Sequence, residues 1–272
     1  MFSIQATWDD SIAFIRRERA LLLPLALATL GLGNMATEVV QAASPLAKSP
    51  VVAQSALLTV LLVALLWIFL GQLAIITLAL RNQCSVGEAL RHAATRLGVN
   101  LLILAMFVLA LVVLCLPPLV AIAPYAPQIQ RNDLSHVHFP GWAILWLIGA
   151  WILAVYVSTR LFVLSPVTID RKGDVLKLIK QSFAATHGVF WRLLAFTFGY
   201  ALFTLIVQAA IAASFGIAFA LLGKMTGSPF TGKVLESLVQ SLLVSGLGLV
   251  GAVFSAKAYQ RLSRTTLDAP RS

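Results

Sequence analysis

The chain has 272 residues, of which 60% are hydrophobic and only 11% are charged, and its formal net charge is +10. Soluble domains carry about 25% charged residues, so this composition excludes a soluble globular protein and indicates one whose apolar surface lies in lipid. We interpret the positive charge as basic loops that face anionic headgroups. A nucleic-acid site is excluded because no basic stretch is interleaved with aromatic residues.

Six charge-free apolar windows divide the chain, and each approaches or exceeds the roughly 20 helical residues that a bilayer crossing requires. In chain order they are residues 20–37, 55–80, 99–116, 142–159, 193–222 and 237–256. Pro117 and Pro118 are expected to end the third span, because proline interrupts helical hydrogen bonding. The fifth window would be about 45 Å long as a helix, so we expect it to tilt, to extend beyond the bilayer or to break near Gly216.

The lysine and arginine residues predict how the spans are oriented. Of the 20, 16 fall before the first span, between the second and third, between the fourth and fifth, or after the sixth. By the positive-inside rule, we expect both termini in the cytoplasm and the protein in a bacterial inner membrane. A cleaved signal peptide over residues 1–42 is the alternative, but Asp9, Asp10 and Glu18 are atypical of one.

Three short amphipathic segments precede the odd-numbered spans, at residues 7–19, 85–97 and 173–183. Thr7 with Asp10, and Ser85 with Glu88, have the spacing of a helix capping box. We expect each segment to form an interfacial helix, with its apolar stripe toward the acyl chains and its cations toward anionic headgroups.

These segments also predict an internal repeat. Residues 87–91 match residues 173–177 in type, and each run follows an even-numbered span. The expected fold is an all-α integral membrane protein, with six transmembrane helices as three hairpin repeats, each preceded by an amphipathic interfacial helix. The whole chain, residues 1–272, forms one membrane domain, and its repeat units are roughly residues 7–80, 85–166 and 170–258.

Residues 160–196 carry a further pattern of an arginine, a proline, an amphipathic helix with a serine, and then a glycine and a tryptophan that open the next span. Its members are Arg160, Pro166, Ser182, Gly188 and Trp191. This pattern resembles the membrane domain fused to some bacterial glycerophosphodiester phosphodiesterases, and its stand-alone relatives. The closing run AKAYQRL, residues 256–262, resembles the tyrosine and arginine exit from that family's last span. The resemblance implies the six-span layout but no phosphodiesterase activity, since the soluble domain is absent from this sequence.

The sequence holds no motif for catalysis or for a cofactor. Asp133, His136 and His138 have metal-ligand residue types at short spacing, but two histidines often occur in a polar loop without a metal, and we favour that interpretation. Arg160 lies near the inner end of the fourth span, where it is expected to extend to the headgroups. The alternative is a pair with Asp170 or Asp174.

Uncharged polar residues and small residues also lie within the spans. Asn34, Gln72, Gln208 and Gln240 are expected to hydrogen-bond between helices, and the alternative is that they line a polar path. Gly248 and Gly251 permit close helix approach, either within the bundle or between copies of the chain.

We therefore expect a non-enzymatic inner-membrane protein that contacts lipids or a protein partner in envelope maintenance. The alternative is a transporter or channel for a small or lipid-like solute, for which the four polar residues would have to converge on one cavity.

Overall fold

The computed structural model describes residues 3–43, 50–81, 84–125, 140–171 and 173–267. Within these residues the chain is helical and forms no strand, and six segments are long and apolar enough to cross a membrane. The all-α class and the number of spans are thereby confirmed. The helices are α1 (Ile4–Arg17), α2 (Arg19–Ala26), α3 (Leu32–Ala43), α4 (Pro50–Leu80), α5 (Val86–Ile122), α7 (Gly141–Leu161), α8 (Leu164–Asp170), α9 (Val175–Thr186), α10 (Phe190–Met225) and α11 (Pro229–Leu267).

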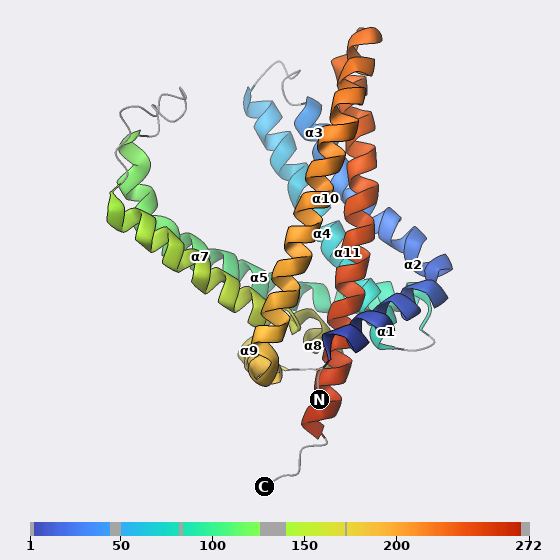
Figure 1. Cartoon of the computed structure of the whole chain (residues 1–272), viewed down its shortest axis with the longest axis vertical. Helices are drawn as coiled ribbons and strands as arrows, with labels where there is room; N and C mark the ends of the chain where they lie inside the picture. The colour runs from blue at the N-terminus through green and yellow to red at the C-terminus, as the bar shows by residue number, and fades with distance from the viewer. Residues whose placement is uncertain (1–2, 44–49, 82–83, 126–139, 172, 268–272) are drawn as a thin grey trace.

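Helix α11 is the centre of the bundle, since it packs against α1, α3, α4 and α10. Helices α10 and α11 form one long hairpin, whereas the α5–α7 hairpin leans away from them (Figure 1). Helices α1, α8 and α9 lie together at one end, beside the carboxyl end of α11. The described cations on these short helices therefore share one end of the molecule.

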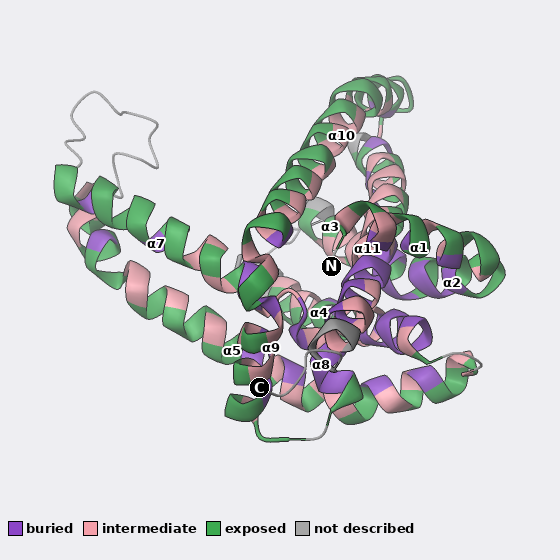
Figure 2. Cartoon of the chain, turned by 60° about the horizontal axis from the view of Figure 1, so that its bottom comes forward, coloured by how far each residue is buried: buried purple, intermediate pink, exposed green. Residues whose placement is uncertain are grey.

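The buried residues concentrate at that same end. Figure 2 shows them around α1, α8 and the adjoining part of α11, while long stretches of α5, α7 and α10 are exposed. The exposed stretches are apolar: Leu145 is 71% exposed and Val120 is 68% exposed. Because an apolar helix surface of this size is not stable in water, we assign it to contact with lipid.

The first amphipathic segment is a separate helix, but it begins earlier than expected. Ser3 is the N-cap of α1, and its hydroxyl accepts a hydrogen bond from the amide of Ala6. Thr7 lies inside the helix, where its hydroxyl donates to the Ser3 carbonyl. The predicted capping box of Thr7 and Asp10 is therefore wrong.

The second amphipathic segment is not a separate helix. The capping box of Ser85 and Glu88 is confirmed, but α5 then continues without a break from Val86 to Ile122. The expected end of this span at Pro117 and Pro118 is also wrong, since both prolines lie inside α5.

The neighbouring helix explains why α5 tolerates these prolines. Pro118 has no amide proton for the carbonyl of Leu114, and the indole Nε1 of Trp146 in α7 donates to that carbonyl instead, at 2.7 Å. In lipid a partner from another helix is the means by which a freed backbone group is satisfied. The span therefore passes through the prolines because α7 stabilises it.

The third amphipathic segment forms α9, which a 3-10 turn at residues 187–189 separates from α10. Helix α10 then runs unbroken past Gly216, so the break considered there does not occur. The short helix α8, which no pattern indicated, lies between α7 and α9. The three predicted repeat units thus differ in their connections, because only α1 and α9 are separate from the spans that follow them.

Candidate functional site

A cavity of about 380 Å³ lies between α4, α10 and α11, and the turn from α7 into α8 closes one end of it. The cavity is open on one side. Its polar lining residues are Gln72, Ser165, Thr197, Tyr200, Thr204, Gln208 and Ser255, and the rest of the lining is apolar. Cavities of this size hold small ligands in many proteins, and a few polar groups on an apolar wall are typical of them.

Helix α10 supplies the cavity with a polar stripe, which we define as Thr197, Tyr200, Thr204 and Gln208. These residues follow one another at intervals of three or four, which places them on one face of the helix. All four line the cavity. Helix α10 therefore directs four of its uncharged polar groups to a single place.

Two hydroxyls of the polar stripe lack hydrogen bonds. The Oγ1 atoms of Thr197 and Thr204 are buried and have no partner among the described residues. Threonines elsewhere in the helices, such as Thr29, Thr77 and Thr159, donate to the carbonyl four residues earlier, at 2.7–2.8 Å. A buried polar group without a partner costs about 1–3 kcal/mol. Both threonines line the cavity, but their Oγ1 atoms are closed off from it, so a ligand would gain these hydrogen bonds when the side chains turn toward the cavity.

Aromatic contacts hold the polar stripe against α11. The ring of Phe196 stacks on Phe254 with centroids 3.7 Å apart, and Phe196 also stacks on Tyr200 at 5.9 Å. The hydroxyl of Tyr200 donates to the carbonyl of Leu247 in α11 at 2.5 Å. Phe254 is fully buried. The wall of the cavity is therefore fixed by aromatic packing together with the hydrogen bond of the Tyr200 hydroxyl.

The four residues proposed for a polar path do not all converge. Gln72 of α4 and Gln208 of α10 line the same cavity. The Asn34 amide donates to the carbonyl of Leu30 in its own helix. Gln240 lines a second cavity of about 420 Å³, together with Glu38 and other residues at the far ends of α3, α10 and α11.

The two glycines predicted for close helix approach pack inside the bundle. A methyl group added at Gly248 would lie 3.0 Å from Leu30, and one at Gly251 would lie 3.6 Å from the ring of Tyr200. Both glycines also line the cavity. Their small size therefore serves contacts of α11 with its own neighbours, and one of these contacts sets the position of the polar stripe.

Arg160 lies inside the protein, so its expected extension to the headgroups is wrong. The residue is 7% exposed, and its guanidinium lies 4.7 Å from the ring centre of Phe190 and 5.3 Å from that of Tyr156. It makes long hydrogen bonds to the carbonyl of Phe183, at 3.5 Å, and to the hydroxyl of Thr186, at 3.4 Å. Apolar and aromatic neighbours leave the guanidinium no route to the surface.

The alternative pairing of Arg160 with an aspartate is also not found among the described residues. Asp170 accepts a hydrogen bond from the hydroxyl of Tyr259 at 2.6 Å, and Asp174 is the exposed N-cap residue of α9. Arg160 nevertheless attaches α9 to α7, because the hydroxyl of Ser182 donates to the Arg160 carbonyl at 2.7 Å.

The remaining residues of the family-like pattern fall into two groups. Pro166 is buried in α8, close in the chain to Arg160. Gly188 has open space around it, and Trp191 is 77% exposed at the start of α10. Arg160, Pro166 and Ser182 thus lie in the junction of α7, α8 and α9, whereas Gly188 and Trp191 lie on the outer surface.

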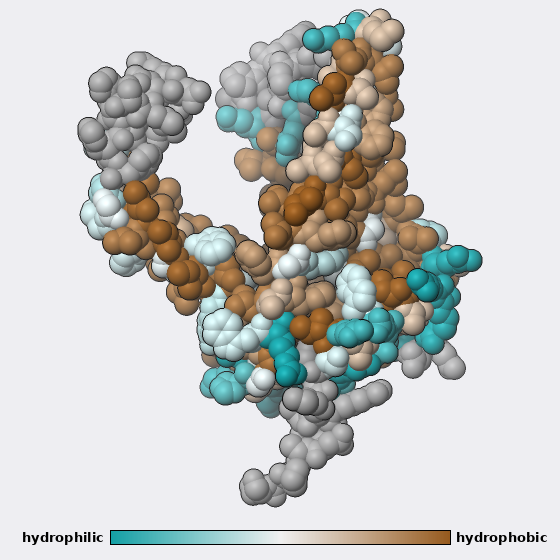
Figure 3. Space-filling view, in the orientation of Figure 1, coloured by the Kyte–Doolittle hydropathy of each residue, from teal (hydrophilic) through white to brown (hydrophobic). Residues whose placement is uncertain are grey.

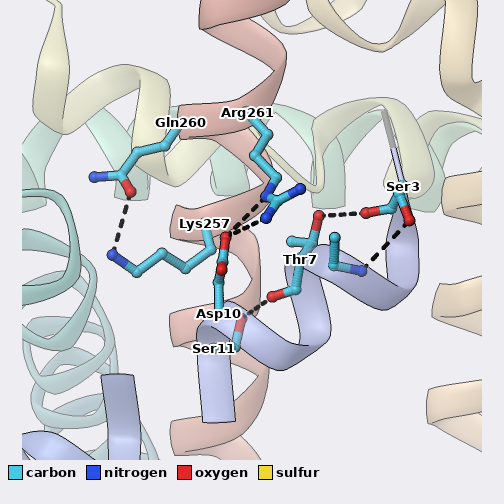
Figure 4. Close-up of polar contacts among 8 residues, drawn as sticks. Ser3, Thr7, Asp10, Ser11, Lys257, Gln260 and Arg261 are labelled. Atoms are coloured by element: carbon cyan, nitrogen blue, oxygen red, sulfur yellow. Dashed lines mark hydrogen bonds and ion pairs between the residues drawn. The ribbon is translucent and has the colours of Figure 1, made fainter. Parts of the chain in front are cut away.

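The carboxyl end of α11 ties together helices that are distant in the sequence (Figure 4). Arg261 forms an ion pair with Asp10 of α1, with its Nη2 atom 2.5 Å from the carboxylate. Lys257 Nζ donates to the carbonyl of Ala79 at 3.1 Å, and the amide of Gln260 donates to that of Leu80 at 3.2 Å. These side chains satisfy carbonyls at the end of α4 that have no partner within their own helix.

The metal candidates Asp133, His136 and His138 lie outside the described residues. Within the described residues, no group of three or more His, Cys, Asp or Glu side chains is placed to hold a metal ion.

The spacing of the polar stripe could have been found in the sequence. Of its four members, the sequence alone indicates only Gln208, because single threonine and tyrosine residues are frequent in membrane helices. The pattern that indicates the site is that Thr197, Tyr200 and Thr204 share one face of the helix with Gln208. Comparisons of the chain with protein-family models, with curated proteins and with solved structures gave no match in any of the three.

Proposed function

We propose that this chain is a non-enzymatic protein of the bacterial inner membrane that holds a lipid or lipid-like amphiphile in the cavity beside α10. The observation that carries this proposal is the pair of buried, unpartnered hydroxyls of Thr197 and Thr204 in the cavity wall. Such groups are costly in an apolar surrounding unless something binds to them.

The surface around the cavity supports a ligand that comes from the membrane. Leu202, Phe203 and Ile206 of α10 are about half exposed or more. By helical spacing Leu202 and Ile206 lie on the face of α10 opposite the polar stripe, and Phe203 lies to one side of it. Figure 3 shows hydrophobic residues along α10 and the α5–α7 hairpin, and hydrophilic residues gathered at the end where α1 and α9 lie. An acyl chain that leaves the open side of the cavity would meet these hydrophobic residues rather than water.

Contacts at the ends of the spans support the resemblance to the membrane domain fused to some glycerophosphodiester phosphodiesterases. Ser182 binds the carbonyl of Arg160, and Tyr259 binds Asp170, so both halves of the resemblance make contacts within the fold. We include membership of that membrane family, the cytoplasmic termini and a contribution to envelope maintenance in the proposal.

Transport of a small or lipid-like solute is the second candidate. Gln208 lies in the first cavity, and Ala212, one turn further along α10, lines the second cavity with Gln240. Ala212 is apolar, but α3 and α11 supply polar groups to the second cavity, so polar groups continue beside α10 toward the far end. Flux of a dithionite-quenched fluorescent lipid across proteoliposomes would show transport. Binding of the lipid without flux would support only the holding function.

The T197V/T204V variant tests the proposed holding function. Valine has the shape of threonine without its hydroxyl, so we expect the variant to be more stable by about 1 kcal/mol and to retain several-fold less copurified lipid. Thermal unfolding in detergent and native mass spectrometry measure the two effects. The control is T77V, which removes a hydroxyl already bonded to the Leu73 carbonyl and should leave lipid retention unchanged. Equal retention in all three proteins would refute the proposal.

Cys84 offers a test of the proposed orientation, in a C115S background with no other cysteine. A membrane-impermeant maleimide is expected to label Cys84 in inverted membrane vesicles and not in intact spheroplasts. Burial, followed by the Glu88 carboxylate 3.7 Å from the sulfur, raises the pKa of this thiol above its usual range. The labelling rate should therefore rise through mildly alkaline pH, and E88Q should increase it at neutral pH. Labelling of Cys84 from the outside in intact spheroplasts would contradict the proposed orientation.

A further inference from the structure

The described lining of the α10 cavity carries no side chain that is charged at neutral pH. Its polar groups are two carboxamides and five hydroxyls. Carboxamides and hydroxyls both donate and accept hydrogen bonds, so together they suit a ligand that also does both. A phosphate monoanion or diester mainly accepts hydrogen bonds, and here it would have no cation beside it.

The cavity also lies deep relative to the cationic end of the protein. Thr197 and Thr204 follow Arg192 by five and twelve residues in one straight helix, which corresponds to about 8 and 18 Å. The hydrocarbon layer is about 30 Å thick, so Thr204 lies near its middle when Arg192 is placed at the headgroups and α10 close to the membrane normal. A charged group at this depth costs about 2.5–3.5 kcal/mol even on the mildest scales, whereas a hydroxyl group costs much less.

A different cavity offers the charges that the α10 cavity lacks. It has a volume of about 440 Å³, lies where α1 and α2 meet the end of α4, and is lined by Arg17, Glu18 and Arg81 beside apolar residues. Glu18 forms an ion pair with Arg17 at 2.9 Å, so the charged side chains of this lining keep a net positive charge through Arg81. An anionic headgroup at the membrane surface therefore matches this cavity at the end of α4 better than it matches the α10 cavity. The two cavities differ in charge and in depth.

We infer that the α10 cavity selects an uncharged, hydroxyl-bearing amphiphile of the diacylglycerol type and discriminates against anionic phospholipids. The inference rests on the proposed function, and it specifies the ligand class of the same site. The free hydroxyl of such a ligand hydrogen-bonds with Thr204 and Gln208, one of its ester carbonyls accepts from Thr197, and its acyl chains lie along the exposed apolar surface of α10.

The test compares dioleoylglycerol with dioleoylphosphatidylglycerol, which share acyl chains and differ in headgroup. Each lipid is titrated into delipidated full-length protein in non-ionic detergent, and native mass spectrometry measures the occupancy. The wild type is compared with T197V/T204V, and with R17Q/R81Q as the matched variant of the charged cavity. We expect T197V/T204V to bind dioleoylglycerol about ten-fold more weakly and to bind the phospholipid as the wild type does. We expect R17Q/R81Q to bind the phospholipid more weakly and to bind dioleoylglycerol as the wild type does.

Two other results have separate meanings. If T197V/T204V loses the phospholipid as strongly as it loses dioleoylglycerol, the cavity accepts charged headgroups; the inference is then overturned while the holding function stands. If T197V/T204V binds both lipids as the wild type does, the α10 cavity is not a lipid site, and the proposed function fails together with the inference.

Discussion

The G71A variant is expected to lose about 1–3 kcal/mol of stability, a large effect for one added methyl group. Gly71 in α4 is buried against the stretch of residues 27–31, where the chain between α2 and α3 widens into a π-helical turn. A methyl group at Gly71 would overlap the Cβ and Oγ1 atoms of Thr29. Thr29 is 3% exposed and its hydroxyl is bonded to the Leu25 carbonyl, so it has no space to move aside.

The partner of Gly71 allows a double-mutant cycle. T29G alone should cost about 1 kcal/mol, because it removes a buried methyl group and because glycine is a somewhat poorer helix former than threonine. T29G/G71A should cost no more than T29G, since the overlapping atoms are absent. The matched control is G199A in α10, where no other group lies within 4 Å of the added methyl and the change should be neutral or stabilising. Thermal unfolding in one detergent measures all four variants. A G71A protein as stable as G199A would contradict the packing described for α4.

The R160M variant is expected to lose about 2 kcal/mol and to loosen α9 from α7. Methionine keeps the apolar stem but removes the bonds to Phe183 and Thr186 and the contacts of the cation with aromatic rings. Hydrogen bonds to charged groups contribute about 1.5–3 kcal/mol, and part of that gain is offset because Arg160 Nε is buried without a partner among the described residues.

Hydrogen exchange of residues 175–186, followed by mass spectrometry, reports the release of α9 directly. Exchange there should accelerate in R160M and remain unchanged in K180M, a matched change at an exposed position of α9. R160K should resemble R160M, because the ammonium group cannot reproduce the planar fork of the guanidinium. Unchanged exchange in R160M would show that Ser182 alone holds α9.

The spans were predictable from the sequence because hydropathy over about 20 residues depends on the lipid and hardly on neighbouring helices. Local signals were predictable only in part. Ser85 and Glu88 form the expected capping box, since the residues of such a box supply one another's partners. The expected end at Pro117 failed because Trp146, distant in the sequence, satisfies the carbonyl that Pro118 leaves free.

The candidate site was less predictable for the same reason. Gln72 and Gln208 were selected as polar residues in spans, but their meeting depends on how α4 and α10 pack. Arg160 was expected at the headgroups because nothing in its own helix indicates that Phe183 and Phe190 surround it. The contacts that a side chain makes within its own helix could be predicted from residue spacing. Contacts with a second helix could be identified only from the folded structure.

A cryo-electron microscopy map of the protein in nanodiscs made with its native membrane lipids would test the cavity most directly. We expect elongated density in the cavity between α4, α10 and α11, with one end about 3 Å from the hydroxyl of Thr204 and the other end on the apolar face of α10. A map in which α10 closes against α4, with the hydroxyls of Thr197 and Thr204 bonded to carbonyls of their own helix, would contradict it.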